Sequence, residues 1–268
     1  MTKNVDLKNH LELVKRQDDE QRWDSIFSLA NNATDELFAT TIEYSSSSIS
    51  IDRILSADVL GRLGDCDLVT SNGSPLGEAS LEILLGMLSV EKDAKVTLSI
   101  ITALQHHHHD KIIDYVVPFK NSCSADIRRA VAFAITGYVD PLAINTLLEL
   151  SKDADIQTRN WSVFAISQQI ESSSKEIIEC LRKSCNDEND EVRAEGLYGL
   201  AIRNDSQFAR LAISVLDQDW VHTLAIQAII KRPVSIVKER LTELLACSDD
   251  DTMSNLLLQA ISKCDMDD

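Results

Sequence analysis

The sequence predicts an all-α protein, an α–α superhelix in which antiparallel helix pairs stack as a solenoid. Three observations predict it. One apolar pattern recurs five times along the middle of the chain, and residues that cap helices precede most copies. Only 8 Gly and 4 Pro occur among 268 residues, which disfavours a turn-rich sandwich or barrel. With 44% apolar residues, the chain can bury a substantial core.

The repeated pattern is clearest in residues 124–135. Apolar residues there are spaced i, i+4, i+7 and i+8, which places them in one stripe on a helix. The same stripe recurs 31 residues earlier, 31 residues later, and then at further intervals of 34 and 29 residues. Its third position is always small, so a neighbouring helix can approach to about 8–10 Å. The five residues at this position are Ala103, Ala134, Ala165, Gly199 and Ala228.

Helix-capping residues stand three positions before the first four stripes. Such side chains accept the unpaired N–H groups at the start of a helix. The fifth copy has Gln218 there, with Asp219 beside it. We therefore expect each stripe to belong to the capped second helix of a pair. The four predicted caps are Asp93, Ser124, Asp155 and Asn189.

The remaining segments complete the pairs, and because no pair can bury its apolar face alone, successive pairs must stack. First helices are expected at 110–120, 140–151, 174–184 and 205–216. A weaker second helix is expected at 51–61, followed by a loop at 64–75. Helices are also expected at 21–31 and 35–44, with a serine-rich loop at 45–50, and at 234–246 and 252–263. We thus predict N-terminal capping helices (1–50), HEAT-like repeats (51–231), and C-terminal capping helices with an acidic tail (232–268).

Three segments of this array resemble a known repeat family. They are Asp126-Ile-Arg-Arg-Ala-Val-Ala-Phe-Ala, Arg159-Asn-Trp-Ser-Val-Phe-Ala and Glu191-Val-Arg-Ala-Glu-Gly-Leu-Tyr-Gly-Leu-Ala201. They resemble short HEAT repeats of the phycobilisome-lyase type, and the likeness extends over residues 50–231. The chain is similar to bacterial stand-alone HEAT-repeat proteins, some of whose relatives resemble immunity proteins encoded beside polymorphic toxins. The resemblance implies that the second helices line a concave surface, the usual binding face.

The net charge of −17, from 43 acidic and 26 basic residues, limits the partners. A surface this negative repels nucleic-acid phosphates and anionic lipid headgroups, and attracts a basic protein. The alternative is that acidity only keeps an elongated protein soluble. No signal peptide or membrane-spanning run is evident, so we expect a monomer in the cytoplasm that binds no nucleic acid and no membrane.

The sequence predicts neither a metal site nor a cofactor. The six cysteines form no CxxC pair, which favours buried structural thiols. The four consecutive histidines, His106–His109, point around a helix and cannot converge on one ion, so we interpret them as a polar helix end. Iron hydroxylases on a HEAT scaffold require His-Glu dipeptides, and this chain has none. A bilin-lyase-like or other modifying enzyme on the same scaffold, and a generic assembly scaffold, remain alternatives.

Arginines recur immediately after the first position of three stripes, as Arg128, Arg159 and Arg193. We expect them to form a structural ladder, each bonding an acid of the neighbouring repeat such as Asp126, Asp155 or Asp190. Arg53 occupies the same place in the weaker copy.

Residues beside these arginines are the predicted binding site. Trp and Tyr are frequent energetic hot spots of protein interfaces, and nearby acids would attract a basic partner. The alternative is that the rings fill gaps between repeats. We therefore expect no catalytic residues and a protein that binds a basic partner, most concretely an immunity protein that neutralises a toxin. The predicted partner-binding residues are Trp161, Glu195, Tyr198, Trp220, Asp190, Glu191, Arg129 and Asn160.

Overall fold

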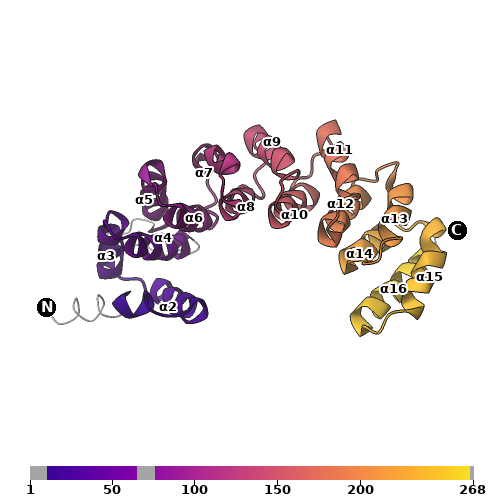
Figure 1. Cartoon of the computed structure of the whole chain (residues 1–268), viewed down its shortest axis with the longest axis horizontal. Coiled ribbons are helices and arrows are strands. Elements are labelled where there is room, and N and C mark those ends of the chain that lie inside the picture. The colour runs from indigo at the N-terminus through magenta and orange to yellow at the C-terminus, as the bar shows by residue number, and fades with distance from the viewer. Residues whose placement is uncertain (1–10, 65–75, 266–268) are drawn as a thin grey trace. The chain divides into compact units, whose positions relative to one another are not determined.

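A computed structural model of the chain describes residues 11–64 and 76–265. Within these ranges every regular element is a helix and no β-strand occurs, which confirms the predicted all-α fold (Figure 1). The loop was expected at 64–75; Gly64 belongs to the last turn of helix α4 (Ser50–Gly64), and residues 65–75 lie outside the described residues. The end of the acidic tail, residues 266–268, lies outside them as well. The chain divides into two compact units, Met1–Ile135 and Thr136–Asp268, each described by itself. The three-part division expected from the sequence stays a prediction.

The first unit is built from helix pairs whose second helices pack side by side. Helix α4 contacts α2 and α6, and α6 in turn contacts α8. The first helices α3 and α5 pack against α4. The elements are α2 (Asp19–Asn31), α3 (Asp35–Ser45), α4 (Ser50–Gly64), α5 (Leu76–Val90), α6 (Ala94–Leu104), α7 (Lys111–Val116), the 3₁₀-helix η1 (Val117–Asn121) and α8 (Ala125–Ala134).

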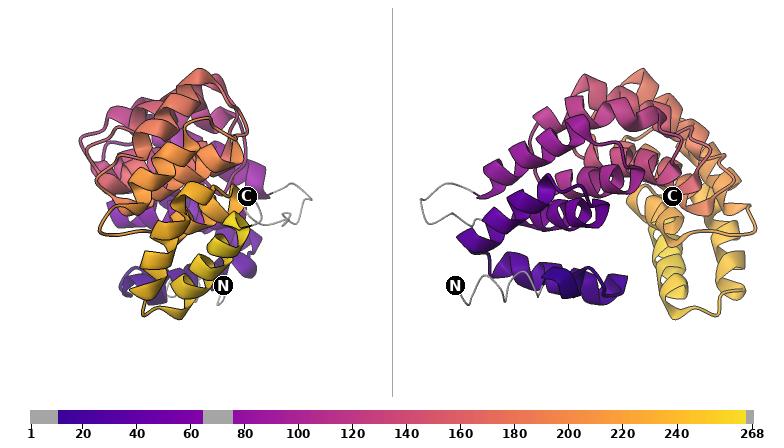
Figure 2. Two further views of the ribbon diagram at one scale, coloured as in Figure 1. Left: turned by 90° about the vertical axis from the view of Figure 1, so that its right-hand side faces the viewer. Right: turned by 60° about the vertical axis from the view of Figure 1, so that its left-hand side comes forward.

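The second unit repeats this arrangement. Its second helices α10, α12, α14 and α16 contact one another in that order, and we call them the second-helix row. Helices α15 and α16 form the last pair and run alongside each other in both views of Figure 2. The elements are α9 (Pro141–Leu150), α10 (Ile156–Phe164), the π-helix η2 (Ala165–Gln169), α11 (Lys175–Ser184), α12 (Asp190–Ile202), α13 (Phe208–Leu216), α14 (Thr223–Lys231), the 3₁₀-helix η3 (Ser235–Val237), α15 (Lys238–Ala246) and α16 (Asp251–Cys264).

Small residues let adjacent helices approach closely. A Cβ added to Gly61 of α4 would lie 2.8 Å from the Cα of Ala103, the small third stripe position of α6. In the second unit, a Cβ on Gly196 of α12 would lie 2.8 Å from the carbonyl oxygen of Leu181 in α11. That neighbour is backbone, which cannot move aside as a side chain can. At these two glycines the helices pack so closely that an added methyl group would collide with the neighbouring helix.

Most predicted caps are present. Asp93 accepts from the N–H groups of Lys95 and Val96, Asp155 from that of Thr158, and Asn189 from that of Val192. Ser124 precedes α8, but its side chain makes no capping hydrogen bond within the described residues, so this part of the expectation is wrong.

The fifth copy starts later than its stripe predicts. Helix α14 begins at Thr223, and the residue that caps it is His222, whose Nδ1 accepts from the N–H of Leu224 at 3.2 Å. Gln218 and Val221 therefore lie before the helix, and the first turn of this copy is missing. Helix α13 is likewise shorter than expected, because Asp205 folds the preceding turn by accepting from the N–H of Gln207.

The histidine run is not uniformly a solvated helix end. Helix α6 stops at Leu104, but His107 is only 5% exposed and its Nε2 lies 3.1 Å from the carbonyl oxygen of Leu60 in α4. The ring fills the space beside Gly64, where an added Cβ would lie 2.6 Å from it. His107 thus packs the turn against α4, and the interpretation as a polar helix end is wrong at this position.

One arginine holds the π-helical end of the α10 segment. Arg203, just after α12, donates to the carbonyl oxygens of Ile166, Ser167 and Ile170 and to those of Ser172 and Gly199. Burial lowers the pKa of this guanidinium. The irregular η2 turn leaves carbonyl groups without helical partners, and a planar group with five N–H donors satisfies them together.

The close contact at Gly196 gives a stability prediction. Gly196→Ala should lower the free energy of unfolding by about 1–3 kcal/mol, because the new methyl group meets backbone. Gly86→Ala in α5 is the matched control, since a Cβ there meets nothing within 4 Å. It should raise stability by about 0.5–1 kcal/mol through helix propensity alone. Urea denaturation followed by circular dichroism measures both, and equal effects of the two substitutions would contradict the packing described here.

Candidate functional site

Arginines in the first turn of the second helices fasten each helix to the loop before it. In four repeats the Nη1 group donates to the carbonyl oxygen of the residue six positions earlier. The loop is thereby held against the helix it leads into. The four bonds are Arg53 to Ser47 at 2.8 Å, Arg128 to Ser122 at 2.9 Å, Arg159 to Asp153 at 2.9 Å, and Arg193 to Asp187 at 3.0 Å.

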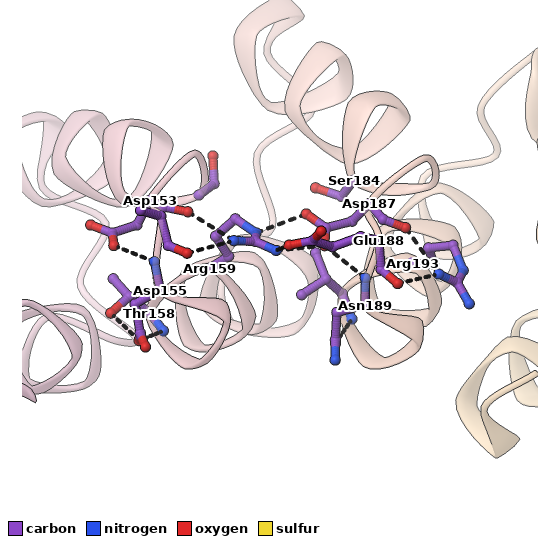
Figure 3. A network of polar contacts seen from close by, with 12 residues as sticks. Asp153, Asp155, Thr158, Arg159, Ser184, Asp187, Glu188, Asn189 and Arg193 are labelled. Atoms are coloured by element: carbon purple, nitrogen blue, oxygen red, sulfur yellow. Dashed lines mark hydrogen bonds and ion pairs between the residues drawn. The ribbon is translucent and has the colours of Figure 1, made fainter. Parts of the chain in front are cut away.

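The other edge of the guanidinium crosses to the next repeat. Arg159 donates from Nε and Nη2 to the two carboxylate oxygens of Asp187, each at 2.9 Å (Figure 3). Arg53 makes the same bidentate contact with Glu91, at 2.7 and 3.0 Å. We call an arginine and the residue it reaches in the next loop a rung. Planar charge-assisted pairs of this kind are the stronger class of hydrogen bond and fix orientation as well as distance.

The acids in these rungs are not those expected from the sequence. Asp155 uses its carboxylate to cap its own helix at Thr158, and Asp126 pairs with Arg129 of the same helix. Asp190 makes no ion pair within the described residues. The acid of each rung instead stands two residues before the cap of the next second helix, where the loop reaches the preceding arginine.

The same loop position has a second role. Asp187 Oδ1 accepts from the backbone N–H of Asn189, the cap of α12, at 3.0 Å. This feature was not predicted, although its signal in the sequence is simple: a residue with a side-chain oxygen two positions before the cap of a second helix. Residues with the same contact are Ser47, Glu91, Ser122 and Asp153.

The rung between α12 and α14 departs from this pattern. Arg193 is only 7% exposed, and its Nη1 donates to the carbonyl oxygens of Asp187 and Glu188. Its Nη2 donates to the backbone carbonyl of Trp220 at 3.1 Å, and its buried Nε makes no hydrogen bond to any described residue. The Trp220 side chain is 79% exposed, more than any other large apolar side chain in the described ranges. Trp220 thus stands where the other loops carry a side-chain oxygen.

Most of the predicted partner-binding residues lie on or beside the second-helix row. Asn160 of α10 donates from Nδ2 to Glu191 Oε2 of α12 at 2.7 Å, and both are half-buried. Trp161 packs edge-to-face on Phe164, with ring centroids 5.7 Å apart, and remains partly exposed. Tyr198 is partly exposed on α12. The two neighbouring helices therefore present aromatic and acidic groups together.

Two predicted binding residues do not fit this group. Arg129 lies on α8 in the first unit, whereas the other seven residues belong to the second. Glu195 is 8% exposed, so it is not the surface acid that we expected. The π-helix η2 brings Gln168 to it, and Gln168 Nε2 lies 2.9 Å from both carboxylate oxygens. Burial raises the pKa of Glu195, and the nearby charge of Glu191 acts in the same direction.

The described residues contain no group of three His, Cys, Asp or Glu side chains arranged to hold a metal ion. No helix in the described ranges is long and apolar enough to cross a bilayer. Among the described cysteines, Cys180, Cys185 and Cys264 are buried, and burial raises the pKa of the Cys185 thiol to about 12. Cys123 and Cys247 are exposed, so buried thiols account for only part of the set.

Comparison with known proteins identifies the type of fold. No family model matches the sequence. The chain is 29% identical over 193 residues to protein YibA of Escherichia coli K12 and of Escherichia coli O157:H7. That match covers 70% of this chain and 66% of each relative, just under two thirds of their length.

Solved structures agree on the architecture. The crystal structure of Escherichia coli YibA superposes with a TM-score of 0.73 at 23% identity, over 95% of each chain. The condensin Cnd3–Cnd2 subcomplex of S. pombe gives 0.62 at 16% identity, over the whole of this chain and 38% of that one. Kap95p, in a structure with RanGDP, gives 0.58 at 13%, over 95% of this chain and 41% of that one. The chain therefore has the fold of HEAT- and armadillo-type helical-repeat proteins.

The buried carboxylate of Glu195 predicts a pH-dependent stability difference. Because its pKa is raised in the folded state, the folded protein favours the protonated form, and the charged form destabilises the fold above that pKa. Glu195→Gln should therefore be more stable than the natural protein at neutral pH. The difference should vanish as the pH falls below the unfolded-state value of about 4.3. Urea denaturation across this range tests it, with the exposed Glu171→Gln as control. A constant difference at all pH values would contradict the assignment.

The rung of Arg193, which contains no carboxylate, predicts a stabilising substitution at Trp220. Trp220→Asp should supply the carboxylate that Arg193 lacks and raise the free energy of unfolding by about 1 kcal/mol, the usual net contribution of an intramolecular hydrogen bond. Gln218→Asp adds the same charge to the same exposed loop and is the matched control. Chemical denaturation by circular dichroism compares the two. A gain no larger than that of Gln218→Asp would show that position 220 cannot complete the rung.

Proposed function

We propose that this chain is a non-catalytic protein-binding solenoid that holds a basic protein against the second-helix row of its second unit. The most concrete version is an immunity-type protein that neutralises a toxin. Helical-repeat scaffolds of this fold are typically protein-binding, and two of the similar structures are assemblies with other proteins, the condensin Cnd3–Cnd2 subcomplex and Kap95p with RanGDP.

One observation carries the proposal: partly or fully exposed aromatic and acidic side chains lie on α10, α12 and the loop before α14, and Asp190 and Glu191 have no cation among the described residues. Asp190 and Glu191 make no ion pair within the described residues, in contrast to the rung acid Asp187. Trp161, Tyr198 and Trp220 supply large, rigid contact area of the kind that dominates protein interfaces.

The overall charge supports the sign of the partner. At −17, the chain attracts a basic surface over a Debye length and speeds the encounter, whereas an acidic protein is repelled. A basic partner also supplies the cations that Asp190 and Glu191 lack.

The charge on α12 can be tested directly. Tagged protein, cross-linked in its own cells and analysed by mass spectrometry, should yield a basic protein in stoichiometric amount. The purified partner should associate several-fold more slowly with the Asp190→Asn, Glu191→Gln variant at low salt, and added salt should reduce the difference.

The matched control removes two charges from the first helices. Glu176→Gln, Glu179→Gln changes exposed residues of α11 and should leave the association rate nearly unchanged beyond the shared effect of net charge. Capture of an acidic partner, or equal rates for the two double variants, would contradict the proposal.

A further inference from the structure

The loop before α14 has lost the polar groups that its counterparts use. Elsewhere the residue two positions before the cap offers a side-chain oxygen, which holds the capping N–H and, in two rungs, a guanidinium. Trp220 can do neither, since indole carries one donor and no acceptor. Trp220 therefore makes neither the contact to the capping N–H nor a side-chain contact to the guanidinium, and it exposes a large ring; both lower the stability of the fold.

The arginine of this rung is nevertheless retained. Arg193 stays buried, and among the described residues its Nε has no hydrogen-bond partner, so its desolvation is offset there by three backbone carbonyl groups. One of those carbonyls is that of Trp220. The guanidinium thereby ties the backbone of the exposed tryptophan to the loop at Asp187 and Glu188. The ring is presented from a fixed backbone, which reduces the entropy lost when a ligand binds.

The surroundings of the ring select the charge of that ligand. Asp217 and Asp219 both precede it in the same loop, Asp219 directly, and both are exposed. Asp217 approaches Arg240 only at 3.7 Å, and Asp219 makes no ion pair in the described part of the chain. The face of an indole attracts cations, and two neighbouring carboxylates strengthen that attraction.

A carboxylate bound by the open edge of Arg193 is the competing occupant. The Nε atom, however, is buried, and the negative charges of Asp217 and Asp219 in the loop before α14 repel an incoming acid. Access and charge both oppose it.

We infer that Trp220 is the anchor for an arginine or lysine side chain of the partner. The cation stacks on the indole ring in a loop that also carries Asp217 and Asp219, and Arg193 acts as a positioning residue that holds the Trp220 backbone. The inference rests on the proposed function, of which it names the principal contact and the group that makes it.

Short peptides test the contact without the natural partner. The probes are blocked pentapeptides with two arginines, two lysines or two glutamates. The contact is read from the indole N–H resonance of Trp220 in the full chain, assigned with Trp220→Phe. Affinities of the natural chain and its variants are compared by isothermal titration calorimetry, because Trp220→Asp lacks that resonance. Both basic peptides should shift it saturably, and the glutamate peptide should not. Asp219→Asn should weaken arginine-peptide binding a few-fold. Trp220→Asp should weaken it about 3- to 30-fold, the range of an exposed to partly desolvated cation–π contact.

Trp220→Asp also separates binding from folding, because it is expected to stabilise the chain while it weakens binding. Arg193→Lys keeps the charge but loses the planar fork, so it should lower the affinity for the arginine peptide while the intrinsic exposure of the ring is kept. An indole resonance that responds to the glutamate peptide alone would overturn the inference in favour of a carboxylate receptor at Arg193. Unchanged peptide affinity in Trp220→Asp would overturn it as well.

The natural partner distinguishes this inference from the proposed function. If a basic protein binds the chain and Trp220→Asp binds it equally well, the anchor is wrong and the function stands. If the arginine peptide binds at Trp220 but no basic protein is captured, the function is wrong and the contact stands.

Discussion

The two-sided arginine contact is the interaction on which the order of the repeats depends. Apolar burial drives the helix pairs together but has no direction, so a stripe of Val, Ile and Ala permits small slides and rotations. Arg159 removes that freedom, because one edge of its guanidinium holds its own loop at Asp153 and the other holds Asp187 of the next repeat. Asp187 in turn fixes the capping N–H of α12. Each rung thus couples one helix start to the next, as a planar fork can and an ammonium cannot.

Periodicity was enough to predict the helices, because few structures other than packed helices fit a stripe at i, i+4, i+7 and i+8 with a small residue at its third position. It could not identify the rung partners. The acid that meets Arg159 is 28 residues away, and several acids compete for the contact in any sequence reading. Nor could it show that Glu195 is buried, since that follows from a π-helical turn that brings Gln168 across. The late start of α14 was equally hidden, because His222 follows Val221 at the position that holds an arginine in three other copies, yet it caps the helix instead.

Arg203 and Arg193 show that this fold can bury a guanidinium without a carboxylate. Arg203 bonds five carbonyl oxygens around the end of η2 and the last turn of α12, where helix dipoles place partial negative charge. Burial still lowers its pKa, so the carbonyl groups replace water incompletely. Arg203 nevertheless has every nitrogen paired, whereas Arg193 leaves Nε unpaired in the described structure. The contact of Arg203 is thus complete within the chain, whereas that of Arg193, beside the exposed Trp220, is incomplete among the described residues.

The acidity of the chain therefore has two physical origins. Acids such as Glu91 and Asp187 form ion pairs with arginines of the neighbouring repeat, so their charge is compensated within the fold. Asp190, Glu191 and Asp219 have no such cation among the described residues, and Asp219 directly precedes the exposed Trp220. Since the break in the ladder at Trp220 costs an ion pair and exposes an indole, and no described contact within the chain compensates for either, the compensation is best sought in a bound partner.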